Sequence, residues 1–222
     1  MIQAVIFDLD GTLIDSERVY REYWTQACKD TGCVLTNEQF LQLRSLNHPD
    51  ADRLMKSWFG PDFDYAAVQG ACASMGKNHL KKYGFPKKDG VDTALKGLKE
   101  RNITAAIATS TDHDTAVLCL EQAGIDPAAF DHVLSAAGIE HGKPAPDVYL
   151  FAAKALGLAP EACLAAEDSP NGLRSARGAG MFVVYVPDLS RPEKEDAPFY
   201  DECTGSLSDL LPLIDRLNQS HD

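Results

Sequence analysis

Basic residues are scarce in this 222-residue sequence, which has 21 lysines and arginines against 33 acidic residues and a formal net charge of −12. This balance argues against binding to nucleic acid or to anionic membrane surfaces. It does not exclude a phosphorylated ligand, because a cation and a few basic side chains can attract phosphate locally. The hydrophobic content of 45% is enough for a sizeable core.

Long apolar runs and cysteine motifs are also absent. No run approaches the length of a membrane span, and the chain opens with a strand-like segment instead of the charged and apolar regions of a secretion signal. The six cysteines are scattered without a Cys-x-x-Cys pair, which favours reduced thiols over a disulfide framework or a complete metal cluster. We therefore expect a cytoplasmic monomer that binds neither membranes nor nucleic acid.

The sequence does contain two different kinds of secondary-structure pattern. A short apolar strand at 2–7 is followed only by helical patterns. The first has apolar residues at helical spacing over 19–28, with Asp15 or Ser16 as its cap and Gly32 as its end, and the others lie at about 37–43, 50–58 and 65–83. From residue 89 helices alternate with strands: we expect helices at 91–101, 113–123, 146–156, 170–179 and 206–217, and strands at 103–108, 132–135, 162–166 and 181–186. This alternation predicts an α/β fold with a parallel sheet, interrupted after its first strand by a helical insert. We expect residues 188–198 to form an exposed loop.

An Asp-x-Asp pair directly follows the first predicted strand. Asp8 and Asp10 precede Gly11, which breaks the strand. Residues two apart on a strand point to the same face, and ligands of open α/β sheets bind at the carboxyl ends of the strands. Two carboxylates at such a position repel each other, and a cation between them or a proton shared by them would offset that repulsion.

Further polar residues follow later strands or precede helices: Thr109, Ser110, Lys143, Glu167 and Asp168. Carboxylate oxygens with room for water are suited to Mg²⁺. A hydroxyl, an ammonium group and exposed backbone N–H groups are suited to phosphate, and a carboxylate can form an aspartyl-phosphate. The set predicts phosphoryl transfer assisted by Mg²⁺.

Taken together, these residues resemble the four ordered motifs of the haloacid dehalogenase-like superfamily, over nearly the whole chain. The motifs are Asp8-x-Asp10-Gly11-Thr12, Thr109, Lys143 and Glu167-Asp168. The segments 10–17, 143–147 and 167–172 are similar to the branch that holds sugar-phosphate phosphatases and β-phosphoglucomutase. The resemblance implies a Rossmann-like core at 1–14 and 87–222 and a helical cap at 15–86 that closes over the phosphate site and excludes water.

The resemblance also implies roles in catalysis. Asp8 would be the nucleophile, although a strand-end carboxylate can instead be satisfied by backbone N–H groups. Asp10 would act as general acid and base and would bind Mg²⁺ through its backbone carbonyl. Lys143 would neutralise Asp8 and the transferring phosphoryl group, and Thr12 would help to hold the loop.

The remaining motif residues would bind the ligands. Thr109 and the backbone N–H of Ser110 would contact the phosphate, unless they only form part of a helix-capping cluster. The expected Mg²⁺ ligands are Asp8, Asp10, Glu167 and Asp168, although an acid pair at 167–168 is also compatible with a helix cap. Whether Glu167 binds the ion directly or through water stays open.

Residues of the expected cap are less constrained by any motif. Glu17, Arg44 and His48 are candidates for substrate specificity, but each is equally compatible with a solvated surface position or, for Glu17, with a first-turn helix acid. Phosphomutases of this branch carry an arginine where this chain has His48, and a histidine where it has Tyr20.

These differences favour a phosphatase for a small phosphorylated metabolite, most simply a sugar phosphate. The alternatives are a β-phosphoglucomutase-like enzyme and, more remotely, a non-catalytic protein that binds a phosphorylated metabolite. Dehalogenation is disfavoured, because dehalogenases of the superfamily need neither the second aspartate nor Mg²⁺.

Overall fold

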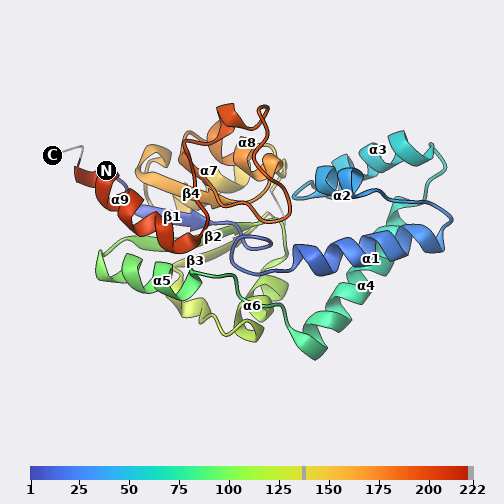
Figure 1. Ribbon diagram of the computed structural model, residues 1–222, viewed down its shortest axis with the longest axis horizontal. Helices are drawn as coiled ribbons and strands as arrows, with labels where there is room; N and C mark the ends of the chain where they lie inside the picture. The colour runs from blue at the N-terminus through green and yellow to red at the C-terminus, as the bar shows by residue number, and fades with distance from the viewer. Residues whose placement is uncertain (137–138, 220–222) are drawn as a thin grey trace.

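A six-stranded parallel sheet forms the centre of the computed structural model, which describes residues 1–136 and 139–219 (Figure 1). The strands are β1 (Ala4–Phe7), β2 (Thr104–Thr109), β3 (His132–Ser135), β4 (Cys163–Glu167), β5 (Phe182–Tyr185) and β6 (Glu202–Cys203), in the order β3-β2-β1-β4-β5-β6. β1 therefore lies between β2 and β4, with Phe7 paired with Ile107 on one side and with Ala166 on the other. The carboxyl ends of these three strands meet at one edge of the sheet.

Helices cover both faces of the sheet. α5 (Val91–Glu100), α6 (His113–Gln122) and α9 (Leu210–Gln219) pack on the face to which Val5 and Phe7 point. α7 (Asp147–Ala155) and α8 (Pro170–Gly178) pack on the opposite face, against Ala4 and Ile6. Alternation along the strands places the next residue after Phe7 on the α7 and α8 side, and it places Glu167 there as well.

Four further helices form a cap between β1 and α5. They are α1 (Glu17–Asp30), α2 (Asn37–Leu43), α3 (His48–Phe59) and α4 (Tyr65–Tyr83). Figure 1 shows them as a lobe beyond the carboxyl ends of the strands, with α1 and α4 packed along each other. The cap has its own hydrophobic core, which is separate from the two cores that flank the sheet.

The prediction of an α/β fold with a helical cap inserted after the first strand is confirmed. The strand predicted at 132–135 has the predicted bounds, and the other strands agree within two residues. The chain enters α3 at His48 instead of residue 50, because Asn47 caps the helix through the N–H of Asp50. The two-residue strand β6 was not predicted, since its sequence is too short to show a pattern.

One local prediction was wrong, and another holds only in part. Neither Asp15 nor Ser16 caps α1 with its side chain; Ser16 occupies the N-cap position, but its hydroxyl donates to Asp10 instead. The segment expected as an exposed loop at 188–198 is exposed over most of 191–198, but it is anchored at its start, where the Asp188 side chain is completely buried. Both side chains belong to a polar network around the strand ends, which outweighs the local preference.

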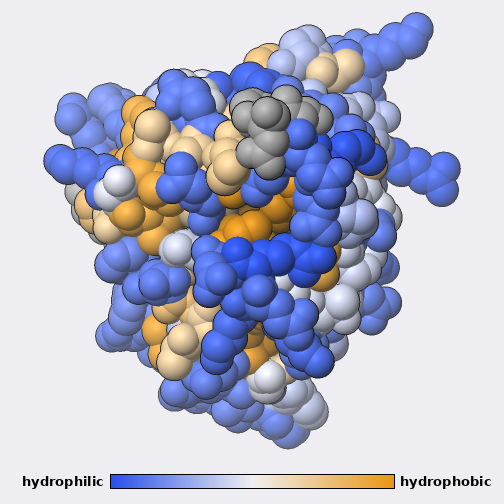
Figure 2. All heavy atoms as spheres, turned by 90° about the vertical axis from the view of Figure 1, so that its left-hand side faces the viewer, coloured by the Kyte–Doolittle hydropathy of each residue, from blue (hydrophilic) through white to orange (hydrophobic). Residues whose placement is uncertain are grey.

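The end of the molecule opposite the cap has a different character. Figure 2 shows this end, where hydrophobic side chains lie exposed among hydrophilic ones. A cavity of about 480 Å³ opens there beside the amino-terminal ends of the strands and is lined by apolar residues such as Ile2 and Ile103 together with polar and charged ones such as Arg101. No helix among the described residues is long and apolar enough to cross a membrane. The polar network lies at the other end of the strands.

Candidate active site

Asp8 lies directly after β1. It is beside the boundary between β1 and β4, where the order of the strands across the sheet reverses. Its carboxylate is almost fully buried, and its Oδ1 accepts a hydrogen bond of 2.5 Å from the Lys143 ammonium. Burial raises the pKa of Asp8 well above its ordinary value, whereas the charge of Lys143 opposes that rise. The alternative in which backbone N–H groups alone satisfy this carboxylate does not describe the structure.

Lys143 joins two carboxylates. Its Nζ lies 2.5 Å from Asp8 Oδ1 and 2.6 Å from Glu167 Oε1, and it also donates to the backbone carbonyl of Ala108 at 3.2 Å. Burial alone would lower the pKa of Lys143, but the two carboxylates outweigh burial and raise it. The ammonium therefore stays charged at any physiological pH, and it holds a positive charge where a phosphoryl group would meet Asp8.

Tyr149, on α7, completes this arrangement and was not predicted from the sequence. Its hydroxyl donates to Glu167 Oε1 at 2.8 Å, and the Lys143 ammonium lies 5.0 Å from the centroid of its ring. The other oxygen of Glu167 accepts from the backbone N–H groups of Asp168 and Ser169. Tyr149 lies six residues after Lys143 in a largely apolar helix. The sequence therefore offered only one sign of its role, a tyrosine with a polar hydroxyl among apolar residues.

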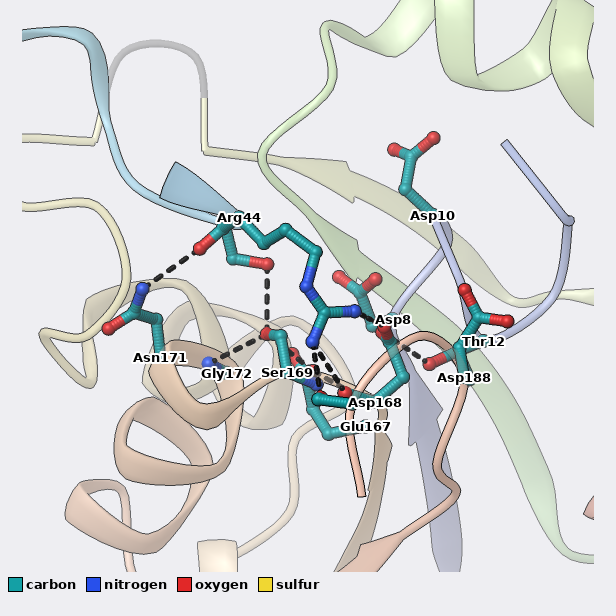
Figure 3. A network of polar contacts seen from close by, with 12 residues as sticks. Asp8, Asp10, Thr12, Arg44, Glu167, Asp168, Ser169, Asn171, Gly172 and Asp188 are labelled. Atoms are coloured by element: carbon teal, nitrogen blue, oxygen red, sulfur yellow. Dashed lines mark hydrogen bonds and ion pairs between the residues drawn. The ribbon is translucent and has the colours of Figure 1, made fainter. Parts of the chain in front are cut away.

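Asp168 is the second acid of the pair that follows β4. Its Oδ1 accepts from the Thr12 hydroxyl at 3.2 Å, and its Oδ2 accepts from Arg44 Nη1 at 2.8 Å. Burial raises the pKa of Asp168 to about 7, against the opposing charge of Arg44. The network around Asp168 is drawn in Figure 3.

Three of the expected metal ligands converge. Oxygen atoms of Asp8, Glu167 and Asp168 lie within 4.8 Å of one another, and all three residues are buried. A cluster of hard carboxylate oxygens is the donor set that Mg²⁺ prefers. A side chain at Gly11 would overlap the Asp168 carboxylate, and one at Gly172 would overlap that of Glu167, so glycine at both positions allows the backbone to approach these carboxylates closely. The donor set therefore fits a magnesium ion.

The Asp10 side chain lies apart from this cluster, and Figure 3 shows its carboxylate directed away from that of Asp8. Its two oxygens accept hydrogen bonds from Ser16 at 2.5 Å and from Thr111 at 2.7 Å. The expectation that both aspartates point the same way assumed that the strand continues, but β1 ends at Phe7 and Gly11 takes a φ of +87°. The structure thus separates one carboxylate bound by an ammonium from another bound by two hydroxyls.

Thr109 ends β2 and is buried, whereas Ser110 is exposed beside it. The Thr109 hydroxyl accepts from the backbone N–H of Thr111, and the cap of α6 is formed by Asp112, which accepts from the N–H of Thr115. Helix capping therefore does not require Thr109 or Ser110. Their predicted contact with phosphate stays a prediction.

The structure distributes the three cap candidates differently. Arg44 reaches the carboxylate cluster, as described above. Glu17 is partly buried in the first turn of α1, where burial raises its pKa and the charge of Arg44 opposes the rise. His48 lies inside the cap, and its Nδ1 is 2.9 Å from the Tyr65 hydroxyl. Of these three candidates, Arg44 is thus the one in direct contact with a predicted metal ligand.

Asp188 and Ser190 belong to the network and were also missed. Asp188 binds Lys88 Nζ at 2.6 Å, and the Ser190 hydroxyl accepts from Arg44 Nη2, also at 2.6 Å. The rule that identified Asp8 and Asp168 applies to Asp188 as well, since it follows the carboxyl end of β5. Its place in a segment rich in proline and charge concealed that signal.

Comparisons of the sequence and of the fold with known proteins point to the same family. A family model described as haloacid dehalogenase-like hydrolase matches residues 2–180. A protein of Bacillus subtilis named putative phosphatase YhcW is 32% identical, with both chains covered completely. A probable pseudouridine-5'-phosphatase of Drosophila melanogaster is 30% identical over 93% of this chain and 90% of its own length. The fold is similar to that of a β-phosphoglucomutase from Clostridium difficile, with a TM-score of 0.84, 20% identity and coverage of 100% and 99%.

Proposed function

The chain belongs to the haloacid dehalogenase-like hydrolases, and on that premise we propose that it is a Mg²⁺-dependent phosphatase of a small sugar phosphate, acting through an aspartyl-phosphate on Asp8. It is an enzyme that hydrolyses phosphoric monoesters, as its relatives named as phosphatases support. Beyond this activity, we propose the metal, the covalent intermediate and the sugar-phosphate substrate.

The observation that carries the proposal is the buried ion pair between Asp8 and Lys143. Asp8 is held at the carboxyl end of the central strand by an ammonium group instead of by backbone N–H groups. An ionised carboxylate is a nucleophile, and the adjacent cation stabilises negative charge that accumulates on a transferring phosphoryl group. A purely structural carboxylate has no need of this arrangement.

In the first chemical step, an oxygen of Asp8 forms a bond to the substrate phosphorus while the bond to the leaving oxygen breaks. Asp10 donates a proton to that leaving oxygen, so that the product departs as an alcohol. The bonds from Ser16 and Thr111 fix Asp10 for this transfer. A bound Mg²⁺ would supply electrostatic stabilisation of the phosphoryl oxygens and would be held by Asp8, Glu167, Asp168 and the Asp10 carbonyl.

In the second step, a water molecule attacks the phosphorus of the aspartyl-phosphate and gives its proton to Asp10. The bond between phosphorus and Asp8 breaks, inorganic phosphate leaves, and both carboxylates return to their starting state. Lys143 favours the ionised form of Asp8 between turnovers, because it holds a positive charge against the same carboxylate.

The surroundings of His48 and Tyr20 support hydrolysis over transfer between two positions of a sugar. A mutase must grip a bisphosphate at both ends, for which the planar fork of arginine is suited. Here His48 is bonded to Tyr65, and Tyr20 packs against Phe85 with ring centroids 5.7 Å apart. Neither provides the arginine or histidine of the mutase pattern.

A phosphate-release assay over hexose and pentose monophosphates tests the proposal. We expect steady release of inorganic phosphate with Mg²⁺, loss of release in EDTA, and almost no turnover by a folded Asp8→Asn variant, because an amide is a poor nucleophile. Asp114→Asn is the matched control, because the side chain of Asp114 is fully exposed. Full activity of Asp8→Asn would contradict the mechanism.

The mutase alternative is tested in the same assay with β-glucose 1-phosphate and a bisphosphate primer. We expect little formation of glucose 6-phosphate. If isomer formation outran phosphate release, the mutase would replace the phosphatase.

A further inference from the structure

The candidate active site is closed. Asp8, Lys143, Glu167 and Asp168 have relative exposures of only 3%, 0%, 0% and 1%. A substrate that must place its phosphorus against Asp8 has no access to it in this arrangement. Some part of the protein must move before the reaction, and the cap is the part that covers the strand ends (Figure 1).

Arg44 fastens the cap to the core at the centre of the site. It stands between α2 and α3, and its side chain is 1% exposed. Nη1 donates to Asp168 Oδ2 at 2.8 Å, while Nη2 donates to the Asp168 backbone carbonyl at 3.3 Å and to Ser190 Oγ at 2.6 Å. One cap side chain thus binds both the loop after β4 and the loop after β5, as the network in Figure 3 illustrates for Asp168.

Neighbouring contacts hold the same cap segment. Asn171 Nδ2 donates to the backbone carbonyl of Arg44 at 2.8 Å, and the hydroxyls of Ser45 and Ser169 lie 2.9 Å apart. Asn171 is at the start of α8, directly after the predicted metal ligands. Closure of the cap and the geometry of these ligands are therefore linked.

The loop after β5 provides the residues of the core that contact this part of the cap. Asp188 binds Lys88, which follows the cap, and it lies 3.9 Å from Arg18 on α1. Leu189 packs against the hydrophobic core of the cap, and Ser190 binds Arg44. The consecutive core residues Asp188, Leu189 and Ser190 thus contact three parts of the chain: the first helix of the cap, the interior of the cap and the segment that follows the cap.

The contact between Arg44 and Asp168 conflicts with metal binding. Asp168 is the same carboxylate that would hold the cation, and a guanidinium and a divalent ion on one buried carboxylate repel each other. The closed contact is also incomplete, because Arg44 Nε is buried and has no acceptor among the residues that the structure describes. A buried donor without a partner is unfavourable, and this N–H can donate one further hydrogen bond.

We propose that Arg44 is a latch, a side chain that holds the cap closed over the carboxylate cluster, and that Mg²⁺ and Arg44 compete for Asp168. The cation displaces the guanidinium and thereby releases the cap, so that substrate enters after the metal. The freed guanidinium then has a donor available for an anionic oxygen of the substrate. The inference rests on the proposed function only in taking Asp168 as a ligand of the cation.

The latch is tested by metal binding and by the dimensions of the protein, both without substrate. Mn²⁺, as a paramagnetic substitute for Mg²⁺, is titrated into wild type, Arg44→Met and Ser190→Ala, and free Mn²⁺ is measured by electron paramagnetic resonance. We expect Arg44→Met to bind Mn²⁺ about tenfold more tightly, within the usual range of coupling between two sites. Ser190→Ala should bind it several-fold more tightly, because it loosens Arg44 without changing any charge.

Small-angle X-ray scattering then reports the position of the cap. The radius of gyration of wild type should increase when Mg²⁺ is added, and that of Arg44→Met should be at the larger value with or without the ion. Arg53→Met is the matched control, since Arg53 is a cap arginine with a side chain that is 78% exposed, and it should behave as wild type.

Each outcome separates the possible explanations. Tighter Mn²⁺ binding by Arg44→Met with unchanged dimensions and an unchanged Ser190→Ala would show simple charge repulsion and would overturn the latch. Normal Mn²⁺ binding by all variants would overturn the latch and leave the phosphatase in place. Absence of Mn²⁺ binding in every protein would overturn both proposals.

Discussion

At the scale of single residues, the two aspartates of the Asp-x-Asp motif have different surroundings. Asp8 faces an ammonium and two carboxylates, and Asp10 faces two hydroxyls. Different environments for two carboxylates are the usual way in which a site assigns one as nucleophile and the other as proton carrier. These surroundings agree with the separate roles proposed for the two residues, Asp8 as nucleophile and Asp10 as general acid and base.

Replacement of Asp10 by asparagine should separate chemistry from metal binding. Asp10→Asn retains the backbone carbonyl and an oxygen that can accept from Ser16 or Thr111, but it cannot transfer a proton. Turnover should fall by about 10²- to 10⁴-fold. Mn²⁺ affinity should stay close to that of wild type. Normal turnover together with lost Mn²⁺ affinity would reverse the assignment of Asp10.

Removal of the Tyr149 hydroxyl should affect the position of Glu167. Tyr149→Phe deletes the bond of 2.8 Å to a buried carboxylate, and hydrogen bonds to charged groups contribute about 1.5–3 kcal/mol. We expect a loss of that size in urea unfolding and weaker Mn²⁺ binding. Tyr83→Phe, at an exposed residue of α4, is the control. Unchanged stability and affinity would show that Tyr149 only fills space.

At the scale of elements, the strand ends and helix starts determine the site. The amino-terminal end of α8 approaches the carboxylate of Glu167 so closely that a β-carbon at Gly172 would overlap it. Gly70, in the middle of α4, has open space around its β-carbon position. The same substitution at these two helical glycines therefore meets opposite surroundings.

Alanine should destabilise the protein at one glycine and stabilise it at the other. Alanine is favoured over glycine inside a helix by about 1 kcal/mol. Gly70→Ala should gain up to this amount in the free energy of unfolding, whereas Gly172→Ala should lose stability and weaken Mn²⁺ binding, since the Glu167 carboxylate must shift. Equal effects on unfolding in urea would contradict this account of α8.

Much of the fold and part of the site could be predicted at this scale. Strand patterns and the rule of carboxyl ends placed Asp8, Thr109, Glu167 and Asp168 at one edge of the sheet, because both signals are local. The contacts of Arg44 with Asp168 and of Lys88 with Asp188 join residues 124 and 100 positions apart. Such contacts depend on how the cap packs against the sheet, which no local pattern encodes.

At the scale of the whole molecule, closing the cap buries several carboxylates with few compensating charges. Burial raises the pKa values of Asp8 and Glu17 above their ordinary range and that of Asp168 to about 7. At Asp168 the folded protein therefore holds a proton that the unfolded chain has lost over most of the range between about pH 4 and pH 7. Stability must depend on pH and on any cation that binds these groups.

The thermal stability of the metal-free protein should therefore fall as the pH rises from about 4 to about 7. An aspartate with a raised pKa in the folded state contributes its full stability below the unfolded value near 3.9, and this contribution is lost as the pH passes the folded value near 7. Melting temperatures in EDTA from pH 5 to pH 8 measure this loss. In Asp168→Asn the decline should be smaller, because the variant lacks the titrating group.

Mg²⁺ should reverse the decline, because the ion binds the ionised carboxylates and competes with protons for them. A ligand at 100 times its dissociation constant stabilises a protein by about 2.7 kcal/mol, which corresponds to several degrees in melting temperature for a chain of this length. The rise on adding Mg²⁺ should thus be larger at pH 8 than at pH 5, and small in Asp168→Asn. A rise independent of pH and retained in Asp168→Asn would place the ion elsewhere on this acidic protein, away from the strand ends where cap, sheet and carboxylates meet.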